Sequence, residues 1–430
     1  MPALASTSSP ADAARAALAA RAPIVLLTGR AGTGKSWFIR ELVKAEQERA
    51  QVLLAPTGLA AMNIGGQTVH SFFGFPPRPL LGFNEKPNWF FTQNVRRLSR
   101  IIVDEVSMLR ADTLDAMDAQ LRAARKSVKP FGGVQILLVG DFYQLPPVVR
   151  GDEERLLEEA GYASPYAFSA LSLREAPVAA VELTEVRRQT DETFIALLQS
   201  IRDRTGVREA VRTLNELCVG APAPPVRPII LTATNAVADS YNRRGLESLP
   251  GDARLLEGGV SGNLPKQGVG ADRLPAPLEL ALKPGARVIF TQNASDGAWV
   301  NGTLGTVKAV EADSVRVAID GGAEVEVTRA SWPQTRWRWN EKAQTMEVEE
   351  EWRYVQFPLA HAWAITIHKA QGMTLDHVGV DLGRGAFAPG QTYVALSRAR
   401  SLSGLRLSRA LREEDVQVDP AIAEGLARLG

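Results

Sequence analysis

Short apolar runs alternate with amphipathic stretches in the first third of this chain. Four of these runs are Ile24–Thr28, Val52–Ala55, Arg100–Val103 and Val134–Gly140. Apolar runs of this length are typical of buried strands, and their alternation with helical stretches is typical of a parallel sheet covered by helices on both faces. The pattern therefore predicts an α/β fold.

A second α/β stretch is expected to begin near Val181. It contains a predicted helix, Thr193–Arg204, with four large apolar residues on one face. A proline-rich connector, Ala221–Pro228, then leads to another apolar strand, Ile229–Thr232. These features predict a further α/β region.

Two segments depart from this alternation. Gly74 to Asn94 is rich in proline, glycine and aromatic residues, which favours an excursion from the sheet. From Trp299 to Phe357 the pattern changes to short alternating strands with turn signals, which predicts a small all-β insert. Mixed α/β character returns at Leu359.

Composition narrows the class of protein. The chain has 430 residues, 45% hydrophobic and 23% charged, which indicates a folded protein of more than one domain. Its formal net charge is only +1, so any nucleic-acid binding must come from a local groove. The single cysteine, Cys218, excludes an internal disulfide and favours a reducing compartment, and no apolar run reaches membrane-spanning length. A cytoplasmic location is expected.

The strongest chemical signal follows the first predicted strand. Gly29–Ser36 has the spacing Gly-x4-Gly-Lys-Ser and opens a helix, as a phosphate-binding P-loop does. Backbone N–H groups of such a loop bind phosphate oxygens, its lysine reaches the β- and γ-phosphates, and its hydroxyl ligates Mg²⁺. ATP and Mg²⁺ are the predicted cofactors, with predicted nucleotide contacts from Gly29, Gly32, Thr33, Gly34, Lys35 and Ser36.

Acidic and amide residues end two further strands. Asp104 and Glu105 follow the apolar run at 100–103, where Asp104 can hold Mg²⁺ and Glu105 can polarise the attacking water. Gln144 follows the strand ending at Gly140 and can sense the γ-phosphate; a solvated glutamine in a proline-stiffened turn is the alternative.

Seven motifs in order resemble the Pif family of superfamily-one DNA helicases, over about residues 25–407. They include the P-loop and the six stretches Pro56–Gly58 with Gly65–Phe72, Lys129–Gly133, Gly140–Pro147, Leu183–Gln189, Thr366–Gly372 and Tyr393–Ala399. RecD-like helicases share several of these motifs.

The resemblance implies two RecA-like P-loop motor domains with ATP in the cleft between them. Residues 23–178 are assigned to the first, with a wedge insertion at about 74–94, and residues 179–296 with 358–430 to the second. An SH3-like β-barrel insert is expected at 297–357, and a flexible N-terminus at 1–22. In the wedge, Trp89, Phe90 and Phe91 either meet the duplex or pack onto the motor domain.

Two arginines are implied at the γ-phosphate. By the resemblance, Arg188 and Arg398 come from the second motor domain and stabilise the charge that develops during phosphoryl transfer. Gly372 is placed beside the nucleotide on the same ground. Arg187, next to Arg188, is interpreted as a solvated or strand-facing charge.

Single-stranded DNA is the implied partner, together with junctions between single strand and duplex. The candidate DNA contacts are Pro56, Thr57, Gly58, His70, Phe72, Pro146, Thr366, His368 and Lys369. Phe72 is an equally good core residue. We expect a monomer and no membrane association, and protein partners are not indicated.

The basic-aromatic run Arg336–Trp339 also suggests DNA contact. If Glu341–Gln344 forms a turn, however, Arg338 faces Glu347 and Arg336 faces Glu349. This register pairs opposite charges across a hairpin, and we favour that structural interpretation over direct DNA contact.

One departure from the family concerns the base of the nucleotide. The family places a glutamine before the P-loop to read adenine, yet no glutamine precedes Gln47 here. Relaxed base preference is therefore expected. Besides a 5′→3′ DNA helicase, the sequence leaves open an RNA helicase, a RecD-like subunit of a larger complex, and an ATP-switched clamp on single strands.

Overall fold

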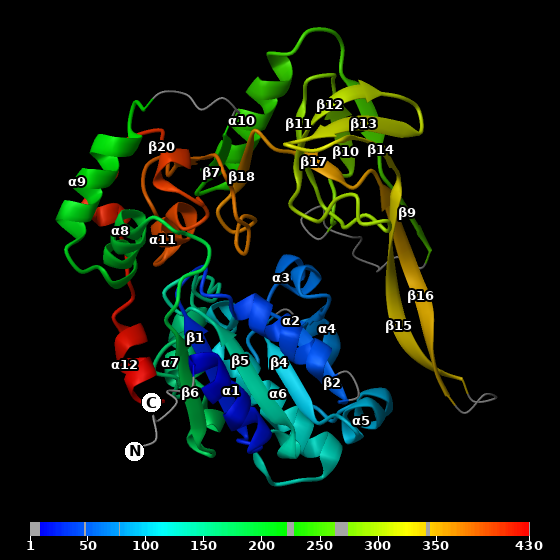
Figure 1. Cartoon of the computed structure of the whole chain (residues 1–430). Coiled ribbons are helices and arrows are strands. Elements are labelled where there is room, and N and C mark those ends of the chain that lie inside the picture. The colour runs from blue at the N-terminus through cyan, green and yellow to red at the C-terminus, as the bar shows by residue number, and fades with distance from the viewer. Residues whose placement is uncertain are drawn as a thin grey trace, which may run out of the picture. The chain divides into compact units, whose positions relative to one another are not determined.

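The computed structural model describes residues 9–46, 49–76, 78–221, 228–262, 274–340 and 345–429. Two compact units divide the chain, residues 1–223 with 367–430 and residues 224–366. Each unit is described by itself below, and Figure 1 labels their helices and strands.

The first unit is built on a parallel sheet of six strands in the order β3-β2-β4-β5-β1-β6. All five pairings within this sheet are parallel. The strands are β1 (Ile24–Gly29), β2 (Gln51–Ala55), β3 (Gln67–Thr68), β4 (Arg100–Val103), β5 (Gln135–Gly140) and β6 (Val178–Leu183). The four apolar runs of the sequence are therefore strands, and the predicted α/β fold is confirmed.

Helices precede, connect and follow these strands, as alternating patterns predict. In the first part of the unit they are α1 (Pro10–Ala19), α2 (Lys35–Ala45), α3 (Gly58–Asn63), α4 (Val69–Phe73), α5 (Trp89–Arg96), α6 (Ala111–Arg125) and α7 (Glu153–Glu159). Later come α8 (Glu192–Asp203), α9 (Val207–Cys218), α11 (Gln391–Leu396) and α12 (Ala421–Ala427). Two further strands, β19 (Val378–Asp381) and β20 (Leu405–Leu407), pair in parallel.

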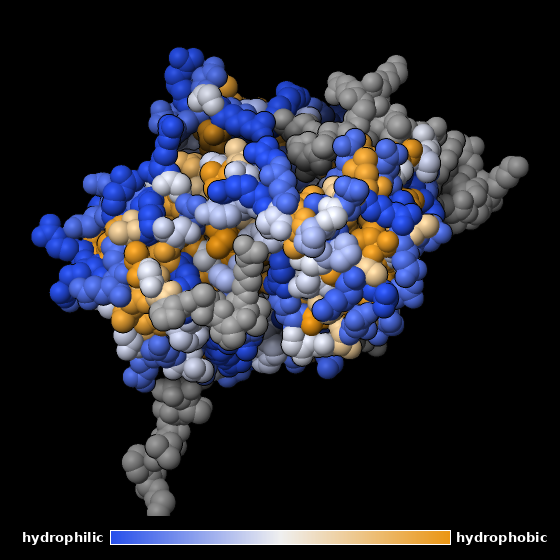
Figure 2. All heavy atoms as spheres, turned by 90° about the horizontal axis from the view of Figure 1, so that it is seen from above, coloured by the Kyte–Doolittle hydropathy of each residue, from blue (hydrophilic) through white to orange (hydrophobic). Residues whose placement is uncertain are grey.

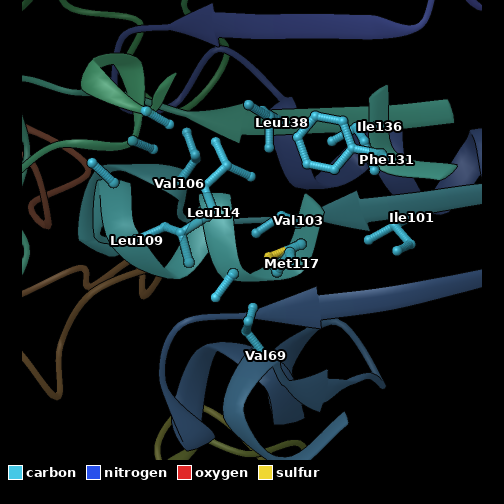
Figure 3. Close-up of a cluster of buried hydrophobic side chains, with 14 of the residues drawn as sticks. Val69, Ile101, Val103, Val106, Leu109, Leu114, Met117, Phe131, Ile136 and Leu138 are labelled. Atoms are coloured by element: carbon cyan, nitrogen blue, oxygen red, sulfur yellow. The ribbon is translucent and has the colours of Figure 1, made fainter. Parts of the chain in front are cut away.

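Helices cover both faces of the six-stranded sheet, and its central strands β1, β4 and β5 are buried almost throughout. On one face α1 and α2 pack on the strands through Leu18, Phe38 and Ile39. On the other face α6 packs through Leu114 and Met117, beside Val103 and Leu138 in Figure 3. This two-sided burial explains why the strands read as continuous apolar runs.

The N-terminal prediction was wrong for residues 10–19, which form helix α1 and not a flexible segment. Ser9 caps it, accepting a hydrogen bond at Oγ from the N–H of Asp12 at 3.2 Å, and Pro10 occupies the first turn. Ala14 and Leu18 are buried against the sheet. Residues 1–8 lie outside the described part of the chain.

The predicted boundary between the motor domains at 178/179 was also wrong. Strand β6 begins at Val178 and pairs with β1, with Ile24 opposite Val178 and Gly29 opposite Leu183. The segment near Val181 therefore completes the first sheet and does not open a second. An apolar run does not reveal its pairing partner, so the sequence could not assign β6.

The excursion after Phe73 packs into the first unit. Phe75, Leu80 and Phe91 are buried in the same core as α6, and Asp112 accepts a hydrogen bond from the N–H of Leu80 at 2.7 Å. Trp89 is 46% exposed. Packing is therefore confirmed for Phe91, while a role of this segment in splitting a duplex stays a prediction.

The second unit is mostly β. A sheet with the order β14-β13-β12-β11-β17 has antiparallel pairings throughout, and a second sheet has the order β15-β16-β9. Strand β10 pairs with β8, and β18 pairs in parallel with β7. The strands are β7 (Ile229–Thr232), β8 (Arg254–Glu257), β9 (Gly259–Gly262), β10 (Glu279–Leu282), β11 (Arg287–Phe290), β12 (Leu304–Val310), β13 (Ser314–Ile319), β14 (Glu324–Thr328), β15 (Ala330–Asn340), β16 (Thr345–Gln356), β17 (Leu359–His361) and β18 (Ala364–Thr366), and the helix is α10 (Asn235–Glu247).

The all-β character predicted for 297–357 is confirmed, but β11 and β17 extend the sheet beyond both predicted ends. The predicted hairpin register is also confirmed along the backbone, where Arg336 lies opposite Glu349 and Arg338 opposite Glu347. The turn at 341–344 and the side chains of Arg336–Trp339 lie outside the described part. The SH3-like barrel and the function of this hairpin stay predictions. The predicted connector also stays a prediction, because its residues 222–227 lie outside the described part of the chain.

No helix in the described ranges is long and apolar enough to span a membrane. On the face drawn in Figure 2, hydrophobic residues form small patches separated by hydrophilic ones.

Candidate nucleotide site

The P-loop joins β1 to α2, and its glycines are required by geometry. Gly34 caps α2 at φ 88°, a left-handed conformation that glycine adopts without strain. Gly32 has φ 80°, and a Cβ there would lie 2.6 Å from Cβ of Arg188. A side chain at Gly32 would therefore force the loop to shift, and so would a residue at Gly34 that disfavours the left-handed conformation.

Lys35 is held inside the loop that it follows. Its Nζ donates hydrogen bonds to the carbonyl oxygens of Gly29 (2.6 Å) and Arg30 (2.9 Å). Burial lowers the pKa of Lys35, and the charges of Asp141 and Glu105 partly offset that effect. The ammonium group is thus positioned at the phosphate cradle with carboxylates nearby.

The two predicted carboxylates lie at the end of β4. Burial and the neighbouring charge of Glu105 raise the pKa of Asp104 to about 7, while Lys35 acts in the opposite direction. Glu105 has a left-handed backbone at φ 52°, which is uncommon for a residue with a side chain and recurs at functional sites. A divalent cation beside Asp104 would keep it ionised, and its carboxylate with the Ser36 hydroxyl is an oxygen donor set of the kind that Mg²⁺ prefers.

Gln144 is buried at the end of β5, so the alternative of a solvated glutamine was wrong. Its Nε2 lies 3.5 Å from Oδ2 of Asp141, which in turn forms an ion pair with Arg202 at 3.0 Å. Asp141 therefore orients Gln144 and also contributes negative charge near Lys35. The sequence pattern predicts no role for Asp141.

Both predicted arginines lie in the first unit, where Arg188 contacts the P-loop and Arg398 follows Ser397, whose carbonyl Arg188 contacts. Backbone N–H of Arg188 donates to the carbonyl of Gly32 (3.2 Å), and its guanidinium donates to the carbonyls of Ser397 (3.1 Å) and Gly372 (3.5 Å). Arg398 is 1% exposed and donates to the carbonyls of Val394 (2.9 Å) and Met373 (3.3 Å).

Burial depresses the pKa of both arginines. For Arg398 the pKa falls to about 9, through burial first and the charge of Arg188 second. For Arg188 the pKa is also lowered by burial. Neither arginine has a carboxylate ion pair among the described residues, so the half-buried Arg188 and the buried Arg398 lie close together with only neutral hydrogen-bond partners.

Arg187 does not point freely into solvent. Its guanidinium lies 5.2 Å from the ring centroid of Trp37, a cation–π geometry, and 3.4 Å from the carboxylate of Glu185. Both Arg187 and Trp37 are about half exposed. The interpretation of Arg187 as a solvated charge was therefore incomplete.

Gln371 and Tyr393 lie within two of the family motifs, but the sequence predicts no role for either. Gln371 Nε2 donates to Oε2 of Glu105 at 2.9 Å. The hydroxyl of Tyr393 accepts a hydrogen bond from the N–H of Ala31 at 2.8 Å, and burial raises its pKa. Both contacts join segments more than 260 residues apart, which no local pattern reveals.

Several candidate DNA residues gather around β2 and β3. Pro56, Thr57 and Gly58 lead into α3, where Thr57 Oγ1 accepts from the N–H of Ala60 at 3.3 Å. His70 and Phe72 lie on α4. Phe72 is half buried, with its ring 5.1 Å from Phe73 and 5.8 Å from Phe91, so part of its surface serves packing.

The remaining DNA candidates lie elsewhere in the chain. Pro146 follows β5, His368 is half buried and Lys369 is exposed, all in the first unit. Thr366 ends β18 in the second unit and is buried. Contact of these residues with DNA stays a prediction.

The loop, the carboxylates near it and the two arginines define a P-loop nucleotide-binding protein with a RecA-like α/β fold. A model of the PIF1-like helicase family matches residues 11–211. This chain belongs to the PIF1-like helicase family, as the following relatives establish.

Curated relatives align over most of the chain. The ATP-dependent DNA helicase Pif1 of Bdellovibrio bacteriovorus is 34% identical over 410 residues, which cover 93% of this chain and 87% of the relative. The ATP-dependent DNA helicase PIF1 of Mus musculus is 38% identical over 398 residues, 89% of this chain. The alignment spans only 57% of the mouse protein's own length.

Solved structures agree in fold. Pif1 from Bacteroides sp in complex with ADP-AlF4 is 31% identical, with a TM-score of 0.83, and covers 98% of this chain and 96% of that one. The Pif1 helicase from Candida albicans is 30% identical, with a TM-score of 0.79, and covers 100% of both chains. The fold is therefore shared with Pif1 helicases over nearly the whole chain.

Proposed function

We propose that this chain is an ATP-dependent DNA helicase that binds single-stranded DNA, moves along it 5′→3′ and separates duplex or structured DNA. The observation that carries the proposal is the convergence of three cations, of which Lys35 and Arg188 are half-buried and Arg398 is buried. Burial lowers the pKa of each, and the charge of Arg188 lowers that of the other two. Like charges held close together are costly unless anions compensate them; Glu105 and Asp141 do so in part, and a bound triphosphate would supply further negative charge.

The same site supports hydrolysis as well as binding. The amides of Gly29, Gly32, Thr33 and Gly34 would hold phosphate oxygens, and Ser36 with Asp104 would hold Mg²⁺. When bound, magnesium neutralises charge on the phosphate oxygens. The remaining roles are polarisation of the attacking water by Glu105, sensing of the γ-phosphate by Gln144, and stabilisation of developing charge by Arg188 and Arg398, next to Gly372.

DNA as the substrate rests on family membership and on relatives. Bacteroides Pif1 has been solved bound to single-stranded DNA, and a further Pif1 structure concerns DNA unwinding at forked duplexes. By likeness, single strands and strand–duplex junctions are the proposed partners here, with contacts from Pro56, Thr57, Gly58, His70, Phe72, Pro146, Thr366, His368 and Lys369. Most of these side chains offer a donor or a ring to a sugar–phosphate backbone.

Unwinding of tailed duplexes tests the proposal. We expect the full chain to unwind a duplex with a 5′ single-stranded tail when ATP and Mg²⁺ are present, and Lys35→Ala to abolish unwinding. Arg208→Ala is the matched control, because Arg208 is 88% exposed and lies outside the site. Unwinding that survives Lys35→Ala would overturn P-loop-driven action, and preference for a 3′ tail would overturn the proposed polarity. Tight, ATP-dependent strand binding without turnover would indicate a clamp in place of a motor.

A further inference from the structure

The segments that carry the two arginines are hydrogen-bonded to the P-loop at two adjacent residues. The carbonyl of Gly32 accepts hydrogen bonds from the N–H groups of Arg187 (2.8 Å) and Arg188 (3.2 Å). The N–H of Ala31 donates to the hydroxyl of Tyr393 on α11, five residues before Arg398. Two segments that are remote in sequence therefore meet the loop side by side.

Gln189 joins those two segments to each other. Its side chain is 2% exposed, and its Nε2 donates to the carbonyls of Ser397 (3.2 Å) and Ala399 (2.9 Å), which flank Arg398 on both sides. Its Oε1 faces the loop, because a Cβ on Gly32 would lie 3.0 Å from it. One amide thus contacts the loop and holds the backbone around Arg398.

The contact is closely packed. The cavity between these segments measures only about 10 Å³ and is lined by Ala31, Gln189, Gln199 and Tyr393, among others. That volume accommodates roughly one water molecule at most. A Cβ on Gly32 would lie 2.6 Å from Cβ of Arg188, so a movement of the P-loop at Gly32 would also displace the segment that carries Arg188.

We propose that Tyr393 and Gln189 are positioning residues that latch the arginine-bearing segments to the P-loop, so that occupancy of the loop and the placement of Arg188 and Arg398 change together. The proposal rests on the proposed function. Neither residue needs to touch the nucleotide. Their effect is to fix where two guanidinium groups lie when the phosphate becomes charged in the transition state.

Affinities for two ligands separate this role from a structural one. The full chain is titrated with ADP alone and with ADP plus aluminium fluoride, which mimics the transferring phosphoryl group, and steady-state ATP turnover is measured with an oligo-dT strand. In Tyr393→Phe and in the similarly sized Gln189→Met, we expect kcat and the affinity for the aluminium fluoride complex to fall about tenfold or more, with ADP affinity and KM changed by less than about threefold.

Tyr354→Phe is the matched control. It also removes one buried tyrosine hydroxyl, which donates to the carbonyls of Ala276 (3.0 Å) and Pro277 (2.9 Å) in the second unit. We expect wild-type values for it. Wild-type kcat and analogue affinity in both latch variants would overturn the proposal, and so would equal losses of ADP and analogue affinity. Because the ligand titrations need no DNA movement, failure of helicase activity in the wild type is distinguishable from failure of the latch.

Discussion

Gln371 donates a hydrogen bond from its side-chain amide to the carboxylate of Glu105, with Nε2 and Oε2 2.9 Å apart. Gln371 is 7% exposed, and Glu105 has a left-handed backbone. The contact therefore fixes a strained residue whose carboxylate is proposed to polarise water. It also links the stretch after β18 to the end of β4.

Removing this contact should slow hydrolysis without preventing nucleotide binding. For Gln371→Ala we expect kcat to fall about 10- to 100-fold while ADP affinity stays within about threefold, because the carboxylate loses its orientation but the P-loop is unchanged. Steady-state turnover and ADP titration measure both quantities. An unchanged kcat would show that Glu105 is oriented by other contacts.

Arg398 should matter far more to the rate than to binding. Arginines that stabilise a transferring phosphoryl group contribute about 10³–10⁵ in rate. We therefore expect Arg398→Ala to lower kcat by at least about 10³, and Arg398→Lys to restore little, since an ammonium lacks the planar fork of donors. Arg208→Ala, on the exposed side of α9, is the control. A fall in kcat of less than about tenfold in Arg398→Ala would show that this arginine does not stabilise the transition state.

Gly390 holds α11 against the Gln144 loop. A Cβ there would lie 2.3 Å from the carbonyl oxygen of Gln144 and 2.5 Å from that of Tyr143, and φ is 71°. Gly390→Ala should therefore cost about 1–3 kcal/mol of unfolding free energy and reduce ATP turnover, since Gln144 must shift. Gly383→Ala is the matched control, with φ 57° but no atom within 4 Å of its Cβ. Denaturant unfolding and turnover of the two variants should differ, and equal values would contradict the steric argument.

Cys218 should be inert while the protein is folded. Burial raises the pKa of its thiol to about 11, so roughly one thousandth is thiolate at pH 8. We expect a disulfide reagent to label it at least about 100-fold more slowly in the native protein than in denaturant. Rapid labelling of the native protein would show that the C-terminal end of α9 opens.

Base selectivity should be weak. In the family a glutamine before the P-loop reads adenine. This chain has no glutamine before its P-loop, because its first glutamine is Gln47. We expect strand-stimulated turnover of GTP to match that of ATP within about threefold. Strict use of ATP would show that other groups read the base.

The sequence by itself determined the phosphate loop, the strands that precede Gly29 and Asp104, and the family. These features are local: a P-loop needs its glycines and lysine at fixed spacing, and buried strands need continuous apolar runs. Even the hairpin register of β15 and β16 followed from alternating charges.

Tertiary structure alone decided which distant segments meet. It assigned β6 to the first sheet, ordered α1 over that sheet, and brought Gln371 to Glu105, Tyr393 to Ala31 and Gln189 to the carbonyls around Arg398. Such contacts depend on packing between elements hundreds of residues apart, and neither propensity nor periodicity carries that information. The residues of the site could therefore be named from the sequence, but the contacts that position them could not.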